Sequence, residues 1–210
     1  MTLRLPRIEL PSWRVLAAAG AGIVVLGGAV FGGWLWFSAR QQRALESFAE
    51  AMVTAQRSQA QGASPAAKIG AIQELEATLG QQPPAAALAQ VTYVLGNLKY
   101  SEGQYPGSRS AYELAAAGKS PTLSRLAQVN LGYTWEAQKD YAKAIEAFER
   151  AVAPLKPGDF LYDELLVNLA RVQELAGQKE AAIKTYRRVL ENPKTRRSDD
   201  IRARLATLEK

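Results

Sequence analysis

The sequence predicts an all-α protein: an apolar N-terminal helix, then a solenoid of stacked helix pairs, then a terminal capping helix. Residues 15–37 contain no charged or strongly polar side chain. Further along, small and large apolar residues recur at helical spacing, and the dipeptide Leu95-Gly96 returns 36 residues later as Leu131-Gly132. A single helix pair cannot bury its own apolar face, so we expect each pair to pack on the next.

The amino-acid composition excludes several kinds of catalytic and metal-binding site in this chain. Of its 210 residues, 22% are charged and 48% are hydrophobic, which is a globular composition. There is no Cys and no His, so disulfides, thiol nucleophiles and histidine bases are excluded and most transition-metal ligands are missing. We therefore expect no enzyme, no cofactor and no metal site. The net charge of +6 permits an anionic lipid or acidic protein partner, whereas no nucleic-acid motif appears and no nucleic acid is expected.

Residues 15–37 are predicted to form a transmembrane helix in contact with membrane lipid. Twenty-three residues span about 34 Å, enough for a hydrocarbon core of roughly 30 Å. Trp13 at one end and Trp34 at the other stand where interfacial aromatic residues belong. The competing interpretation is a cleaved signal peptide, whose core is usually about 7–15 residues long. Because this run is longer, and because bulky Phe37 precedes the small Ala39, an uncleaved anchor is favoured.

Charge sets the expected orientation of this span. Residues 1–14 form a short segment with three arginines, and two arginines closely follow the span, so the bias predicts a cytoplasmic N-terminus. The C-terminal domain would then be periplasmic, in a single-pass protein of the inner (cytoplasmic) membrane of a bacterial cell. Gly28 and Gly32 form a small-xxx-small pair, which is compatible with a homodimer held through the span.

Residues 38–84 are predicted to hold a helical linker and a degenerate first repeat. Residues 40–61 have helical composition with one apolar stripe. Gly62 breaks this helix. Ser64, as a cap, and Pro65, in the first turn, then open a second helix that runs to about Leu79.

Three further repeats are predicted over residues 85–197. Leu-Gly or Leu-Ala pairs begin at Leu95, Leu131 and Leu169, at intervals of 36 and 38 residues. Each pair is followed by small residues and an aromatic residue, and the two extra residues of the last interval fall in a loop near residues 156–159. Residues 198–210 carry an apolar stripe behind a capping serine, Ser198, and are predicted to form the capping helix.

These motifs resemble the tetratricopeptide repeat (TPR) family, which carries Leu-Gly, an aromatic residue, Ala, Phe and Ala in this order. The resemblance covers about residues 44–210 and is strongest over residues 85–193. It implies a curved solenoid whose first helices line a concave groove that binds an extended or helical protein segment. The repeat register places these residues in the protein-binding groove: Gln90, Tyr93, Asn97, Tyr100, Leu126, Val129, Tyr133, Glu136, Glu164, Val167, Arg171 and Glu174.

The carboxylate clamp that some TPR domains use is not expected in this chain. Asn97 and Asn130 match the two asparagine positions of that clamp. Its three cationic positions are occupied by Tyr93, Glu164 and Asn168, so the positive charges that would hold a carboxylate are missing.

The layout of one span followed by a periplasmic TPR domain is similar to the ancillary protein of the Sec translocon and to TPR proteins of cytochrome c maturation. This resemblance implies an adaptor or scaffold for protein partners, which assists a membrane complex or the translocation and assembly of envelope proteins. Two alternatives stay open: a self-assembling scaffold, and an enzyme built from carboxylates such as those of Asp159, Asp163 and Glu164. The basic residues from Lys184 to Arg204 form either a patch for anionic lipid or acidic protein, or a solvated surface.

Overall fold

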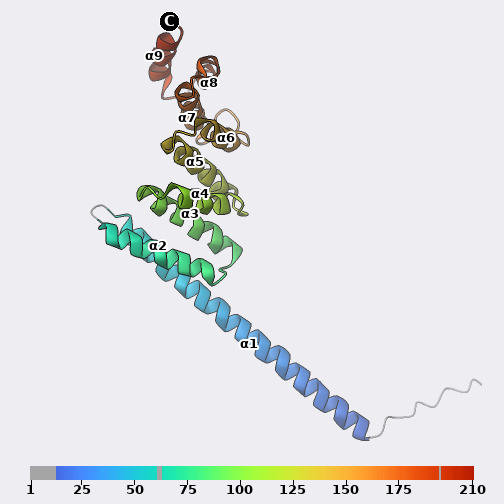
Figure 1. Ribbon diagram of the computed structural model, residues 1–210. Coiled ribbons are helices and arrows are strands. Elements are labelled where there is room, and N and C mark those ends of the chain that lie inside the picture. Colours follow the sequence, from blue (N-terminus) through green and yellow to red (C-terminus); the bar gives the residue numbers. More distant parts are fainter. Residues whose placement is uncertain (1–12, 61–62, 194) are drawn as a thin grey trace, which may run out of the picture. The chain divides into compact units, whose positions relative to one another are not determined.

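The computed structural model describes residues 13–60, 63–193 and 195–210, with the side chains of residues 13–25, 85 and 86 outside the description. Within these residues every regular element is an α-helix, numbered α1 to α9 (Figure 1). The chain divides into two compact units, residues 1–46 and residues 47–210. The predicted all-α architecture of stacked helix pairs is confirmed for the described part of the second unit.

The first unit contains most of α1 (Trp13–Ser58), which is one continuous helix. From Leu26 to Phe37 its side chains are exposed; Phe31 is 60% and Trp36 is 66% accessible. Among the helices described here, none combines the length and the apolar character needed to cross a membrane. The side chains of residues 15–25, which belong to the predicted span, and all of residues 1–12 lie outside the description. The membrane span and the cytoplasmic N-terminal segment therefore stay predictions.

The second unit begins with the last turns of α1, which pack with α2 (Pro65–Gly80) and the next helix. Ala51 and Ala55 of α1 share a buried cluster with Ile72 and Leu75 of α2 and with Val91. The start of α2 follows the sequence signals. Ser64 Oγ accepts a hydrogen bond from the amide of Ala67 at 3.2 Å, and proline occupies the first turn, where its missing N–H costs nothing.

Three helix pairs follow one another along the unit (Figure 1): α3 (Ala85–Ser101) with α4 (Tyr105–Ala116), α5 (Pro121–Ala137) with α6 (Tyr141–Val152), and α7 (Tyr162–Leu175) with α8 (Lys179–Leu190). The turn inside each pair needs a left-handed residue at the same place, with φ of +71° at Gly103, +61° at Lys139 and +74° at Gly177. Lys139 shows that a residue with a side chain is accommodated there, at a cost of roughly 1 kcal/mol relative to glycine.

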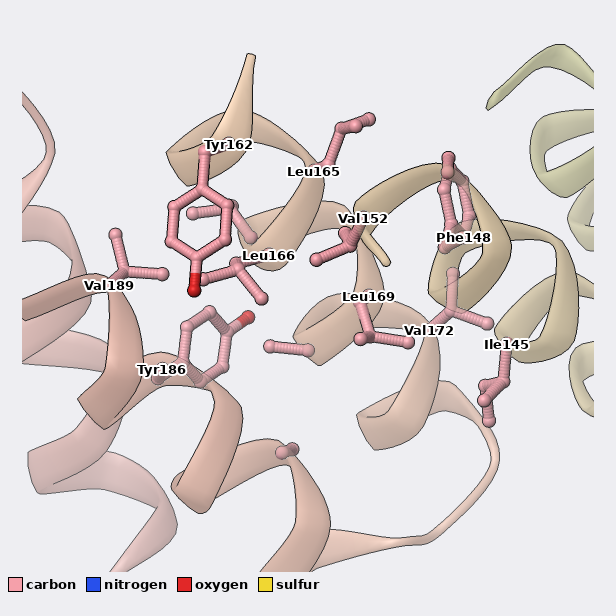
Figure 2. Packing of buried hydrophobic residues seen from close by; sticks show 14 of the residues in the cluster. Ile145, Phe148, Val152, Tyr162, Leu165, Leu166, Leu169, Val172, Tyr186 and Val189 are labelled. Atoms are coloured by element: carbon pink, nitrogen blue, oxygen red, sulfur yellow. The ribbon is translucent and has the colours of Figure 1, made fainter. Parts of the chain in front are cut away.

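The inside of each of the first two pairs is filled by an aromatic ring that lies against a glycine. A Cβ atom added to Gly132 would lie 2.7 Å from the ring of Phe148, and one added to Gly96 would lie 2.5 Å from the ring of Tyr112. Phe148 is fully buried. It belongs to the large apolar cluster of α5 to α9, of which Figure 2 shows the part around Leu166, Leu169 and Tyr186.

Replacing Gly132 by alanine is expected to lower the free energy of unfolding by about 1–2 kcal/mol. The fully buried ring of Phe148 must move, an overpacking cost of about 1–3 kcal/mol, of which alanine's better helix propensity returns at most about 1 kcal/mol. Gly70 of α2 is the matched control, because nothing lies within 4 Å of the Cβ it would gain. Gly70→Ala should raise stability in the same urea titration, and equal effects of the two substitutions would contradict this account of the packing.

The solenoid ends at α9 (Ser198–Leu208), which buries Ile201 and Leu205 in the same apolar cluster as α7 and α8. The predicted terminal helix is therefore present and covers the end of the last pair. One detail of the prediction is wrong. Ser198 is the first residue of the helix rather than its cap; the capping position is occupied by Arg197, with no side-chain hydrogen bond to the helix.

Candidate functional site

The predicted groove residues come from α3, α5 and α7, the first helices of the three pairs. α3 and α5 are in contact, and polar side chains of successive first helices meet one another directly. We call this surface the ladder face and define it by eight residues: Tyr93, Asn97, Asn130, Tyr133, Glu136, Asn168, Arg171 and Glu174.

The first contact across the ladder face joins α3 to α5 through two amides. Asn130 Nδ2 donates to Asn97 Oδ1 at 3.0 Å and to Tyr93 Oη at 3.3 Å. The hydroxyl of Tyr112 donates to the same Asn97 oxygen at 2.7 Å. Burial raises the pKa of Tyr112, so its hydroxyl keeps the proton that it donates. Asn97 Oδ1 thus receives two hydrogen bonds, which fixes the orientation of its amide.

The second contact joins α5 to α7. Asn168 Nδ2 donates to Tyr133 Oη at 2.9 Å, and Asn168 is only 7% exposed. The Tyr133 ring meets Phe148 edge to face, with centroids 5.2 Å apart. This contact holds the Tyr133 ring, and therefore its hydroxyl, in place. Burial and the nearby Glu164 carboxylate raise the pKa of Tyr133, which keeps this hydroxyl neutral.

A two-point ion pair forms the third contact. The guanidinium of Arg171 on α7 donates through both terminal nitrogens to the carboxylate of Glu136 on α5, with Nη2 2.8 Å from Oε2. These hydrogen bonds raise the pKa of Arg171 further. Paired forks of this kind hold both side chains in one geometry.

The last contact joins α7 to the terminal helix. Glu174 Oε1 accepts from Arg204 Nε of α9 at 3.0 Å and from Tyr186 Oη of α8 at 2.7 Å. Burial acts to raise the pKa of Glu174, but the hydrogen bonds from Arg204 and Tyr186 hold it below its ordinary value. Burial and the bond to Glu174 raise the pKa of Tyr186 to about 12. At the other end of α7, Arg197 Nη1 donates to Glu164 Oε2 at 2.8 Å.

The lowered pKa of Glu174 makes the docking of α9 sensitive to acid. A carboxyl whose pKa is lower in the folded state adds stability above its unfolded pKa and loses it as the pH falls through the folded value. Between pH 7 and pH 3, Glu174→Gln should therefore lose less stability than the natural chain, as measured by urea unfolding at each pH. The exposed Glu146 is the control, because Glu146→Gln should leave the acid-induced loss almost unchanged. Equal losses in the natural chain and the Glu174 variant would contradict the role given to this carboxylate.

The structure distributes the other predicted groove residues unevenly. Gln90 and Tyr100 are exposed and Leu126 is half-buried. Val129 and Val167 are each only 9% exposed and belong to the apolar cluster, so they offer a partner little surface.

Sequence reasoning left four partners out of the predicted groove, although a signal for them exists. Each bonds to a groove residue 30–37 positions earlier in the chain, close to the repeat length. A comparison of polar residues about one repeat apart would have found them: Asn130, Asn168, Arg197 and Arg204.

The other two clusters considered in the sequence are held by internal contacts. Asp159 accepts from the amide of Lys156 at 2.8 Å, and Asp163 accepts from Asn192 at 2.7 Å. In the basic segment, the arginines 187, 188, 197, 202 and 204 each contact an acidic or tyrosine side chain. Among the described residues no three acidic side chains come together in a way that could hold a metal ion.

Comparison with known proteins bears on the repeats. Tetratricopeptide repeat models match residues 93–160 and 164–195. No curated protein matches the sequence closely enough to be compared. The solved structures that are similar include a Podosopora anserina protein with nearly identical TPR-like repeats, at 19% identity. Its TM-score is 0.59, over 80% of this chain and 85% of that one.

A second similar structure is that of MamA, at 23% identity and a TM-score of 0.51, over 60% of this chain and 69% of the other. At such identities the likeness concerns the fold alone. The fold, the glycine–aromatic packing inside the pairs and the two matching repeat models agree with one another. Residues 93–160 and 164–195 of the chain are tetratricopeptide repeats.

Proposed function

We propose that this protein is a membrane-tethered adaptor that binds a segment of a partner protein on its ladder face. The observation that carries the proposal is the continuity of that face. Amide, hydroxyl and aromatic groups run without interruption from α3 through α5 to α7, and the contacts between them hold the three helices in one register. Repeat arrays of this kind bind extended or helical segments along their first helices.

The tether is proposed from the sequence. Residues 15–37 are uncharged, and the exposed side chains that follow Leu26, such as those of Phe31 and Trp34, are the kind that lipid or another apolar surface covers. The arginine bias around this segment favours a cytoplasmic N-terminus, which in a bacterial cell leaves the repeats in the periplasm, beside membrane complexes and envelope proteins under assembly. Extraction of membranes with alkaline carbonate tests the tether: the protein should stay in the pellet. Protease added to spheroplasts should digest the repeats, and their protection would reverse the orientation.

Site-specific photo-crosslinking in native membranes tests the adaptor function. A photoreactive amino acid at Tyr100, which is exposed beside the ladder face, should give a discrete adduct with a second protein. The same amino acid at Leu114 of α4, which is 53% exposed, is the control and should give none. Mass spectrometry then identifies the captured chain.

Other adducts would change the conclusion. An adduct made of two copies of this chain would favour a self-assembling scaffold over an adaptor. If positions 100 and 114 gave the same adducts, the ladder face would have no special role in binding, and the proposal would fail.

A further inference from the structure

The charged side chains of the ladder face form ion pairs with other residues of the same chain. Glu136 is paired with Arg171, Glu164 with Arg197, and Glu174 with Arg204. Every charged residue predicted for the groove therefore has an opposite charge within the solenoid. A charged ligand would have to displace one of these partners. These ion pairs carry no net charge in sum, so they do not attract a charged ligand.

Three groups of the ladder face keep a hydrogen-bond donor that the contacts between the helices do not use. Asn97 Oδ1 already accepts from Tyr112 and Asn130, so the amide hydrogens of Asn97 are what it has left to offer. Tyr93 and Tyr133 use their oxygens to accept from Asn130 and Asn168. No described residue accepts the hydroxyl proton of either tyrosine. All three groups are half-buried, and each presents a donor.

The apolar part of the same surface is aromatic. Tyr100 packs edge to face on Tyr105, with centroids 5.7 Å apart, and is 37% exposed. Tyrosine rings that are already fixed bind apolar side chains at little cost in conformational entropy. Hydrogen-bond donors placed among such rings suit a peptide whose side chains are uncharged and whose backbone carbonyls face α3, α5 and α7.

We propose that the ladder face selects an uncharged peptide segment and holds its backbone carbonyls with the Asn97 amide and the Tyr93 and Tyr133 hydroxyls. This inference rests on the proposed adaptor function and adds the class of partner to it. Binding should depend little on salt, since no ion pair is formed or broken. A terminal carboxylate should add nothing, because the cations of the ladder face and those that pair with it, Arg171, Arg197 and Arg204, are already matched.

Asn97→Asp is the sharpest variant for testing this. Its carboxylate keeps an oxygen for Tyr112 and Asn130 but replaces the amide hydrogens with a second acceptor, which repels a peptide carbonyl. Gln73→Glu is the matched control, because it makes the same amide-to-carboxylate change on an exposed position of α2 away from the ladder face. Thermal unfolding of both variants checks that the fold is kept.

The probe is an array of random 12-residue peptides in three sets, which are uncharged, acidic and basic, each with free and with amidated C-termini. The whole chain in detergent should be retained by uncharged peptides, whichever C-terminus they carry, and affinity should change less than about twofold between 50 and 500 mM NaCl. Asn97→Asp should weaken this binding at least about tenfold, because the hydrogen bond from the Asn97 amide is lost and the peptide carbonyl is left unpaired. Gln73→Glu should bind as the natural chain does.

Two different failures can be told apart. Retention only by acidic or basic peptides, or full binding by a folded Asn97→Asp variant, would overturn the donor inference and leave the adaptor function standing. If no peptide of any set were retained, and crosslinking at Tyr100 gave no adduct, the adaptor proposal would fail together with this inference.

Discussion

Phe148→Ala should lower the free energy of unfolding by about 3–5 kcal/mol, the largest effect of any single truncation proposed for this chain. The ring is fully buried, lies against Gly132 and meets Tyr133 edge to face. Its removal leaves a cavity that a backbone packed this closely cannot fill. Urea unfolding followed by circular dichroism measures the change. Because Tyr133 rests on this ring, binding on the ladder face should also weaken.

Leu114→Ala is the control for that truncation. Leu114 is 53% exposed on α4, and its loss should change stability by no more than about 0.5 kcal/mol. A loss at Phe148 below about 1 kcal/mol would mean that the pair of α5 and α6 is less tightly packed than the buried ring indicates.

Ile201→Asp should release the terminal helix. Ile201 is 2% exposed within the apolar cluster, and an unpaired buried charge costs about 3–5 kcal/mol, so undocking α9 is the less costly outcome. Trypsin should then cut rapidly after Arg196 or Arg197 and free the last residues. Exposure of the apolar side chains that α9 covers should also cause aggregation at lower temperature.

Ala203→Asp provides the matched control, because it adds the same charge to an exposed position of the same helix. It should leave the trypsin digestion pattern of the natural chain intact. Rapid cleavage in both variants would show that helix propensity, rather than burial of Ile201, keeps α9 in place.

The pairing of helices could be predicted from the sequence because it depends on short-range patterns. The Leu-Gly pairs and the aromatic residues that follow them give the register, and the packing of Phe148 on Gly132 follows from it. Likewise Ser64 and Pro65 predict the start of α2 through backbone geometry alone. The chain's local signals and its tertiary contacts therefore agree in the repeats.

A spacing of about one repeat indicates candidate partners for the ladder contacts, but the offset between neighbouring pairs decides which of these side chains meet. Asn130 reaches Asn97 across 33 residues, whereas Tyr133 reaches Asn168 across 35, and spacing in the sequence does not determine which side chains meet. Val129 lies in the apolar core although its register position predicts a groove residue.

The ladder also limits how the array can change its number of repeats. Asn130 and Asn168 hold equivalent positions, so loss of the whole pair of α5 and α6 would bring Asn168 to the place that Asn130 occupies beside Asn97. Arg171 would lose its ion-pair partner, because the position equivalent to Glu136 in the preceding pair is occupied by Tyr100. The guanidinium of Arg171 would then have no carboxylate to pair with. Deletion of the pair of α5 and α6 thus leaves the charge of Arg171 unpaired where the remaining pairs meet. The pairs of this chain are therefore not interchangeable modules, and their order is part of the fold.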